Sequence, residues 1–244
     1  MNKYCDTSKL SVRYIDRNTA KRMVIKYHYS HLWSPKNNCA LGLFYNTGNE
    51  HAFFNESAEE LIGVITYGDP VGRHSGISIC KLLDRTEVYE LTRLYVHDGY
   101  GSNIESWFIS QSFKWLKQNK PKIKALISYA SPMEGHVGII YQATNWIYQG
   151  NRIRPNDSWL FRLTENGEWI HGRTLANTHK TNDIEKLKKK IGHTFWKKKD
   201  LRKHRYVYAL QNKRKILNNL KYPSLPYPKS VDKEELEIIK VKIK

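Results

Sequence analysis

The sequence predicts a mixed α/β fold in which helices flank a central sheet and a basic segment extends the C-terminal side. Between Glu87 and Tyr148 the apolar pattern changes in the order strand, helix, strand, helix. Glycines follow the first of these strands and predict a turn. From Lys180 to Lys221 fifteen Lys and Arg residues stand against three acidic residues, a net charge of +12 out of +18 for the whole chain.

Periodicity predicts the elements in chain order. Strands are expected at 11–16, 40–46, 61–70, 87–96, 124–130 and 205–210, and a hairpin from 158–163 and 168–175 around a Glu-Asn-Gly turn. Helices are expected at 17–31, 105–119, 131–146 and 184–192. A polar loop at 46–60 and an insertion at 71–86 separate strands, and a proline-rich stretch at 222–228 ends the fold.

Composition indicates a globular protein of a reducing compartment. The chain is 40% hydrophobic, and no apolar run approaches the roughly 18 residues of a membrane span. Its first residues are polar, unlike a signal peptide. Cys5, Cys39 and Cys80 lie far apart and form no disulfide framework or metal motif. We expect a cytoplasmic protein with no membrane partner.

The localised charge points to a polyanion, and double-stranded DNA is the expected partner. Phe195, Trp196, Tyr206 and Tyr208 are interleaved with the cations and suit base stacking. The alternative is a solvated amphipathic helix followed by an ordinary strand. The expected DNA-binding residues are Lys188, Lys189, Lys197, Lys198, Lys199, Arg202, Lys203 and Arg205.

Two helix starts carry the pattern of a capping box. Ser102 is followed three residues later by Glu105, and Ser131 by Glu134. We expect each glutamate to act mainly as a cap. A functional role stays open, because both helix starts would follow strand ends, where open α/β sheets bind ligands.

The order of ELTRLYV, the ESWF helix and SYASPMEGHVGIIYQATNW resembles the GNAT acyltransferase fold. Together with KHRYVYAL and LKYPSLPYPK it more closely resembles the Mom family of bacteriophage DNA-modifying proteins, over most of residues 11–228. The resemblance implies a GNAT-like transferase acting in the host bacterial cytoplasm. It implies conversion of adenine N6 in DNA to a carbamoylmethyl (acetamido) derivative, which protects phage DNA from host restriction.

Three parts are expected along the chain. Residues 1–164 would form the GNAT-like catalytic core, and residues 165–228 a basic segment that completes the fold and contacts DNA. Residues 229–244 would form a terminal helix or tail.

The loop after the fourth strand departs from the GNAT pattern for binding coenzyme A. Val96 stands where those enzymes carry Arg or Gln, although Gly99 and Gly101 are kept. Asp98 and Glu105 would repel a pyrophosphate. Acyl-CoA is therefore disfavoured as donor. A small-molecule or carrier-bound group donor stays open, as does participation of a metal such as iron.

Modification of adenine N6 requires a base taken out of the stack and held against aromatic side chains. The end of the first helix supplies several candidates, among them His28 and His31, whose spacing is also compatible with a metal pair. Because no carboxylate or third ligand is spaced with them, solvated or hydrogen-bonded histidines are the preferred interpretation. The expected substrate-binding residues are Tyr29, His31, Trp33, Tyr67, Tyr129, Ser131 and Glu134.

The catalytic candidates are Tyr141, Arg93, Glu90, Ser106 and His136. By resemblance to GNAT enzymes, Tyr141 would protonate the leaving group. Strand alternation places Arg93 on the side of Leu91, where it either forms an ion pair or holds a phosphate, a carboxylate or the donor's carbonyl oxygen. Glu90 would face the other side as a candidate base. Ser106 lines the donor site or merely allows close helix packing.

Two other functions stay open from the sequence. One is an acetyl-CoA-dependent GNAT N-acetyltransferase acting on protein, tRNA or a small amine, which would bind acetyl-CoA saturably. The other is a non-enzymatic basic DNA-binding protein, which would tolerate Tyr141→Phe but not charge reversal at Lys197 to Lys199.

Overall fold

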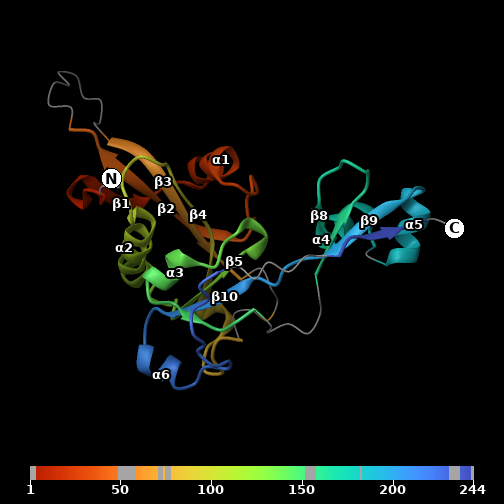
Figure 1. Cartoon of the computed structure of the whole chain (residues 1–244). Coiled ribbons are helices and arrows are strands. Elements are labelled where there is room, and N and C mark those ends of the chain that lie inside the picture. The colour runs from red at the N-terminus through yellow and green to blue at the C-terminus, as the bar shows by residue number, and fades with distance from the viewer. Residues whose placement is uncertain are drawn as a thin grey trace. The chain divides into compact units, whose positions relative to one another are not determined.

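The computed structural model describes residues 4–48, 59–70, 74, 78–151, 158–181, 183–230 and 237–242. Much of the predicted loop at 46–60 and insertion at 71–86 lies outside the described residues. The chain forms two compact units (Figure 1). Unit 1 comprises Met1–Tyr129, Ile139–Gln149 and Arg205–Tyr227, and unit 2 comprises Ala130–Gly138, Gly150–His204 and Pro228–Lys244.

Unit 1 contains a mixed seven-stranded sheet with the strand order β1-β2-β3-β4-β5-β10-β6. Strands β1 to β4 pair antiparallel, β4 and β5 pair parallel, and β10 pairs antiparallel with β6. The predicted fold class is confirmed. The strands are β1 (Leu10–Tyr14), β2 (Asn37–Asn46), β3 (Glu59–Gly68), β4 (Val88–Val96), β5 (Ala125–Ala130), β6 (Ile147–Tyr148) and β10 (His204–Ala209).

Local capping interactions and backbone angles set where α1 begins and ends. The Asp16 carboxylate accepts hydrogen bonds from the backbone N–H groups of Asn18 and Thr19 and caps α1. This helix ends at Tyr27, before the predicted end, because His28 has extended backbone angles. The helices are α1 (Arg17–Tyr27), α2 (Ile104–Asn119), α3 (Ile139–Ala143) and α6 (Lys213–Leu217), with 3-10 turns at Thr7–Lys9 and Arg85–Glu87.

Helices α1 and α2 cover opposite faces of the sheet (Figure 1). Ala20 and Val24 of α1 pack against Val64 of β3. The hydroxyl of Tyr67, also on β3, lies 2.6 Å from that of Ser112 on α2. Because side chains alternate along a strand, Val64 and Tyr67 point to different faces. The sheet is therefore the middle layer of three.

A β-bulge in β4 decides which of its side chains share a face. Thr66 of β3 pairs with Arg93, but the next residue of β3 pairs with Leu91, so Thr92 is an extra residue. Glu90 and Arg93 consequently lie on the face of Thr66, and Leu91 lies on the other. The predicted alternation, which grouped Arg93 with Leu91 and separated it from Glu90, was wrong because a bulge breaks the two-residue period.

Unit 2 contains a four-stranded antiparallel sheet with the order β11-β9-β7-β8. Leu175 and Leu187 from its two helices pack with Phe161, Phe195 and Val241 on one face of this sheet. The predicted pairing of 158–163 with 168–175 is confirmed by β7 and β8. The elements are β7 (Trp159–Arg162), β8 (Ile170–His171), α4 (Gly172–His179), α5 (Ile184–Ile191), β9 (Phe195–Lys199) and β11 (Ile239–Val241).

Three segments differ from the predicted elements. The helix expected at 131–146 is reduced to a 3-10 turn at Pro132–Glu134 and to α3, since Gly135 and Gly138 adopt positive φ angles of 73° and 85°. The strand expected at 168–175 stops at His171, where α4 begins. Where a terminal helix or tail was expected, Ile239–Val241 forms strand β11.

The predicted capping boxes are absent from these helix starts. Helix α2 is preceded by Asn103, which has a φ of 64° and makes no capping hydrogen bond with its side chain. Ser131 does precede the 3-10 turn, but its side chain makes no capping hydrogen bond either. A capping box is found instead at Asp84 and Glu87. No helix in the described ranges has the length and apolar character needed to cross a membrane.

Candidate active site and nucleic-acid interface

Two buried hydroxyls in unit 1, those of Ser128 on β5 and Tyr141 on α3, lie 2.8 Å apart. Ser128 Oγ is also 2.9 Å from the carbonyl oxygen of Leu91. The backbone pairing of β4 with β5 ends at Glu90 and Ile127. The Ser128 hydroxyl therefore donates the hydrogen bond that the backbone carbonyl of Leu91, the next residue of β4, requires. When Ser128 instead donates to Tyr141, the phenol proton can go to another acceptor.

The surroundings of Tyr141 keep its phenol protonated. Its side chain is only 7% exposed, and this burial raises its pKa well above that of an ordinary tyrosine. The hydrogen bond with Ser128 lowers the pKa, while Tyr29, Glu90 and Tyr206 raise it further. A phenol in this state can donate a proton at neutral pH but does not act as a base.

Arg93 is held by backbone rather than by a carboxylate. Its Nε donates to the carbonyl oxygen of Leu32 at 2.9 Å, and one terminal nitrogen donates to that of Thr92 at 2.6 Å. No carboxylate oxygen of the described residues lies within 4.0 Å of its guanidinium. The ion-pair interpretation from the sequence is therefore not observed. The other terminal nitrogen keeps its two N–H groups for an anion or a carbonyl oxygen.

Tyr29, Glu90, Arg93 and Tyr141, all four of them site candidates from the sequence, are linked through their influence on one another's pKa. Burial lowers the pKa of the Arg93 guanidinium, whereas Tyr29, Glu90 and Tyr141 act in the opposite direction. Tyr29 and Glu90 also act on Tyr141. The bulge in β4 turns Glu90 and Arg93 to one face of the strand. A cation, a carboxylate and a protonated phenol thus lie within electrostatic range of one another.

A cleft of about 280 Å³ opens beside the start of β2. Two buried donors of residues in its wall, Trp33 Nε1 and Asn37 Nδ2, have no hydrogen-bond partner among the described residues. Asn37 Oδ1 accepts from Thr92 Oγ1 at 2.5 Å, which ties this wall to the bulge. Burial raises the pKa of the Cys39 thiol to about 11, so it is not a thiolate nucleophile. The cleft is lined by Tyr14, Ile15, Arg17, Trp33, Asn37, Asn38, Cys39 and Ala40.

Two predicted site residues have structural roles. Tyr67 is fully buried with its hydroxyl 2.6 Å from that of Ser112, so we leave it out of the substrate site. Ser106 donates its hydroxyl to the carbonyl oxygen of Asn103 at 2.9 Å, as serines in helices commonly do. Its proton is therefore engaged by its own helix.

The two histidines after α1 are engaged by local hydrogen bonds. His28 is buried and its Nδ1 accepts from the backbone N–H of Ser30 at 3.1 Å. His31 Nδ1 donates to the carbonyl oxygen of Ile25 at 2.8 Å. In the described ranges no group of three His, Cys, Asp or Glu side chains is arranged to hold a metal ion.

The remaining candidates follow β5. Tyr129 is partly buried in unit 1 and packs against the cluster that contains Val88. Ser131, Glu134 and His136 belong to unit 2, where the backbone N–H of His136 donates to the carbonyl oxygen of Ser131 at 3.1 Å. Glu134 and His136 are exposed. Their roles stay predictions.

Most of the predicted DNA-binding cations lie in unit 2. Lys188 and Lys189 are on α5, Lys197–Lys199 on β9, and Arg202 and Lys203 follow that strand. Arg205 differs, because it is 5% exposed and its Nε donates to Gln149 Oε1 at 2.8 Å. We leave Arg205 out of the interface, since a buried cation cannot reach a phosphate.

The aromatic residues expected to stack on bases likewise differ in exposure. Phe195 and Tyr206 are fully buried, and Tyr208 stacks on Phe113 with 4.1 Å between ring centroids. These three therefore belong to the packing of their units. Trp196 remains partly exposed on β9.

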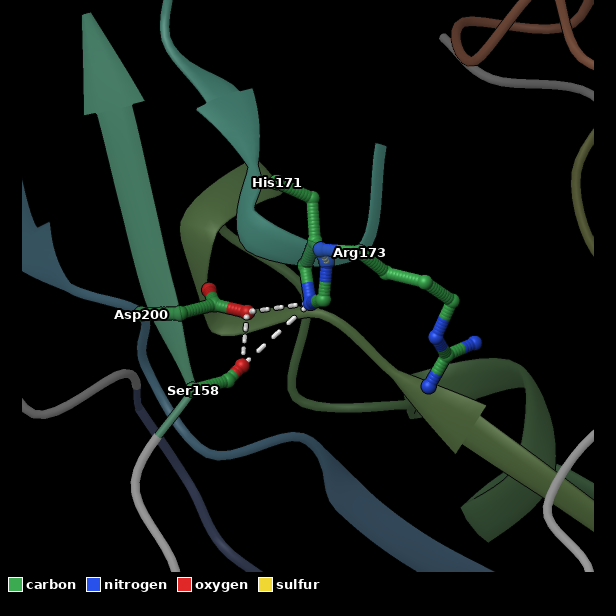
Figure 2. A network of polar contacts seen from close by, with 4 residues as sticks. All are labelled: Ser158, His171, Arg173 and Asp200. Atoms are coloured by element: carbon green, nitrogen blue, oxygen red, sulfur yellow. Dashed lines mark hydrogen bonds and ion pairs between the residues drawn. The ribbon is translucent and has the colours of Figure 1, made fainter. Parts of the chain in front are cut away.

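Ser158, His171 and Asp200 in unit 2 have the residue types of a hydrolase triad (Figure 2). Their geometry is different. Ser158 Oγ and Asp200 Oδ2 both face His171 Nε2, at 3.3 and 3.8 Å, whereas a triad divides its nucleophile and carboxylate between the two ring nitrogens. His171 Nδ1 accepts from the backbone N–H of Arg173 at 3.0 Å and so caps α4.

The groups around His171 also determine its pKa and the position of its proton. Burial lowers its pKa, Asp200 raises it, and Arg173 and Lys203 lower it. Since Nδ1 accepts the capping N–H, the neutral ring carries its proton on Nε2 and can donate it to Ser158. Ser158 in turn donates to Asp200 Oδ2 at 3.1 Å. These hydrogen bonds connect the start of β7, strand β8 and the residue after β9.

The turn between β4 and α2 keeps its glycines in the left-handed region. Gly99 and Gly101 have φ angles of 98° and 105°, where only glycine fits easily. Asp98 is exposed and Glu105 lies in the first turn of α2. Two carboxylates thus stand where a helix start would otherwise attract a phosphate.

Sequence reasoning missed Ser128, Thr92 and Asn37. A serine inside the apolar strand ALISYA was a usable indication, because a hydroxyl buried there needs a partner. Thr92 and Asn37 gave no such indication. Their contact joins residues 55 positions apart in the sequence and depends on the bulge.

Known proteins resemble this chain in sequence and in structure. The chain is 26% identical over 230 residues to the methylcarbamoylase Mom of Escherichia phage Mu, which covers 91% of this chain and 85% of that protein. It is similar to the solved structure of Arabidopsis thaliana NAA60 in complex with acetyl-CoA, with 14% identity, 82% and 98% coverage and a TM-score of 0.43. A Vibrio cholerae spermidine N-acetyltransferase matches with 8% identity, 83% and 95% coverage and a TM-score of 0.41. The model of the Mom protein family matches residues 9–229, and the chain belongs to this family.

Proposed function

We propose that this protein transfers a carbamoylmethyl group to N6 of adenine in DNA and so protects phage DNA from host restriction enzymes. It is an enzyme of the transferase type, like its relative the methylcarbamoylase Mom. The observation that carries the proposal is the buried, protonated phenol of Tyr141, which is hydrogen-bonded to Ser128 and near enough to the charges of Arg93 and Glu90 for its pKa to be coupled to theirs.

The chemistry assigns a role to each of these groups. Adenine N6 forms a bond to the carbon of the incoming group, and the bond from that carbon to the leaving atom of the donor breaks. The leaving atom takes the electron pair and a proton from Tyr141. N6 gives its proton to the Glu90 carboxylate. Arg93 directs its remaining N–H groups at the carbonyl oxygen of the donor.

The cleft beside β2 supports a place for the adenine. An extruded base needs an aromatic face and hydrogen-bond donors for its ring nitrogens. Trp33 supplies the indole, and Asn37 supplies an amide of the kind that pairs with adenine edges. Because Asn37 bonds Thr92, the neighbour of Arg93, a base bound here would be linked directly to the catalytic strand.

The basic residues of unit 2 complete the proposal. Lys188, Lys189, Lys203 and their neighbours would neutralise DNA phosphates, which binds DNA without regard to sequence. Chemistry in unit 1 and DNA contact in unit 2 would thereby be divided by unit and not at the expected boundary after residue 164, because residues 150–204 belong to unit 2 and residues 205–227 to unit 1.

The test reads the product directly. The wild-type chain and Tyr141→Phe are expressed at equal levels in a bacterial host, and the DNA is digested to nucleosides and analysed by mass spectrometry. We expect carbamoylmethyl-deoxyadenosine with the wild type and almost none with the variant. Only ordinary nucleosides in both samples would reject the proposal.

A second experiment examines the biological consequence. Plasmid DNA from both hosts is treated with restriction enzymes whose sites contain adenine and with others whose sites lack it. Resistance confined to adenine-containing sites and to the wild-type sample is expected. An N-acetylated product instead would identify a conventional acyl transfer.

A further inference from the structure

One side chain from each of β11, β9 and β7, together with Trp169 just before β8, forms a row across the outer face of the unit 2 sheet. Lys240 of β11 pairs with Trp196 of β9, which pairs with Arg162 of β7. Continuing the antiparallel register of β7 with β8 places Trp169 next to Arg162. Lys198, two residues along β9, also reaches Trp169. We call these five residues the outer row.

Cations and indoles alternate along the outer row. Lys240 Nζ is 5.6 Å from the ring centroid of Trp196, and the Arg162 guanidinium lies 5.1 Å from Trp196 and 5.0 Å from Trp169. Lys198 Nζ is 4.4 Å from Trp169. With strands about 4.8 Å apart, the row spans roughly 14 Å.

The opposite face of the same sheet is closed. Phe161, Phe195 and Val241 point there and are covered by Leu175 of α4 and Leu187 of α5. The indoles of the outer row are therefore not part of the hydrophobic core of unit 2, and they are only partly buried.

The cations of the outer row have no anionic partner among the residues that the structure describes. In the described part of the chain, none of Arg162, Lys198 and Lys240 lies within 4.0 Å of a carboxylate oxygen. Arg162 Nε is buried without any hydrogen-bond partner there. A flat surface that offers both unpaired cations and planar aromatic faces is complementary to a ligand that carries both phosphates and bases.

We infer that the outer row binds single-stranded DNA, stacking unpaired bases on Trp196 and Trp169 while the cations contact the phosphates. A closed duplex offers only phosphates to such a surface, because its base faces are stacked on one another. The choice of DNA rests on the proposed function. That chemistry takes an adenine out of the stack, which leaves unstacked bases next to it.

The experiment compares a labelled single strand with a labelled hairpin duplex of equal phosphate number, by fluorescence anisotropy at one salt concentration. Trp196→Leu should weaken single-strand binding by about tenfold and hairpin binding much less, since stacking is lost but charge is not. Trp196→Phe should restore most of the affinity. Each variant's melting temperature is measured, and if Trp196→Leu unfolds, Trp169→Leu beside the edge strand carries the test.

Adjacent lysines provide a matched control. Lys198 and Lys199 carry the same charge on β9, but strand alternation turns Lys199 to the face of Trp159, with which it pairs. Lys198→Gln should weaken single-strand binding more than Lys199→Gln.

Equal losses for the two lysine variants, or equal effects of Trp196→Leu on single strand and hairpin, would overturn the inference and leave the proposed function standing. Failure of the proposed function would look different. It would appear as DNA with only ordinary nucleosides, even where single-strand binding depends on Trp196 as expected.

Discussion

The two units use aromatic side chains in opposite ways. In unit 1, Tyr141 lies 5.1 Å by ring centroid from both Trp146 and Tyr206, and these three rings are buried. In unit 2, Trp169 and Trp196 remain partly exposed and take cations on their faces. Burial among rings raises the pKa of a phenol, so that it keeps its proton at neutral pH. An exposed indole beside cations can instead contact a ligand with its ring face.

Charge follows the same division. Unit 1 holds Arg93 with two backbone carbonyls close to Glu90 and Tyr141, which suits a single reacting group. Unit 2 spreads its cations over α5 and β9, which suits an extended polyanion. Variants confined to one unit can test the proposal that unit 1 carries the chemistry and unit 2 the DNA contacts.

The largest effect is expected for Tyr141→Phe. Removing a general acid should lower modification by about 10²- to 10⁴-fold while DNA binding is unchanged. The fraction of modified adenine in digested DNA measures the first and anisotropy the second. Tyr67→Phe is the matched control, because it removes another buried hydroxyl bonded to a serine. Equal losses in both variants would remove Tyr141 from the chemistry.

Arg93→Lys should lower modification by about 10²-fold. Lysine keeps the charge but cannot bond two carbonyls and still present a planar pair of donors. The rate is measured at saturating DNA so that binding does not contribute. Arg13→Lys, at the exposed ion pair with Glu59, should leave the rate unchanged. An Arg93→Lys enzyme with wild-type turnover would contradict the assignment.

Lys189→Gln in unit 2 should weaken DNA binding a few-fold without changing turnover at saturating DNA. Each lost phosphate contact should reduce the slope of log K against log salt by about 0.9. Binding titrations over a range of salt concentrations measure this slope. Lys21→Gln on α1 of unit 1 is the control and should leave the slope unchanged. If both variants behave alike, the charge acts over the whole molecule and the comparison fails.

The smallest effect concerns His171. Its pKa is lowered in the folded protein, so its contribution to stability is fully present above the unfolded value of about 6.5 and is lost as pH falls through the folded value. We expect a loss of less than about 1 kcal/mol, because the side chain is partly exposed. Melting curves from pH 7 to 5 measure it. His171→Asn keeps a capping acceptor without titrating and should flatten this part of the profile.

Some of the site could be predicted from local sequence and some could not. Tyr141, Arg93 and Glu90 were chosen from resemblance and residue type, and their roles stay predictions, whereas the expected separation of Glu90 from Arg93 was wrong because of the bulge. Tyr67, Ser106 and Arg205 were selected for residue type and position. In the structure they are hydrogen-bonded to Ser112, Asn103 and Gln149, respectively. Ser112 and Gln149 are distant in the sequence, so these two contacts could not be predicted from local pattern.

The sequence by itself determined the mixed α/β class, most strands and the basic C-terminal third. These follow from periodicity and charge, which are properties of neighbouring residues. Only the tertiary structure decided that Thr92 is a bulge, that Ser128 meets Tyr141, and that Trp196 aligns with Arg162. Each of these depends on the register between strands distant in the chain, and a shift of one residue would turn every side chain to the other face.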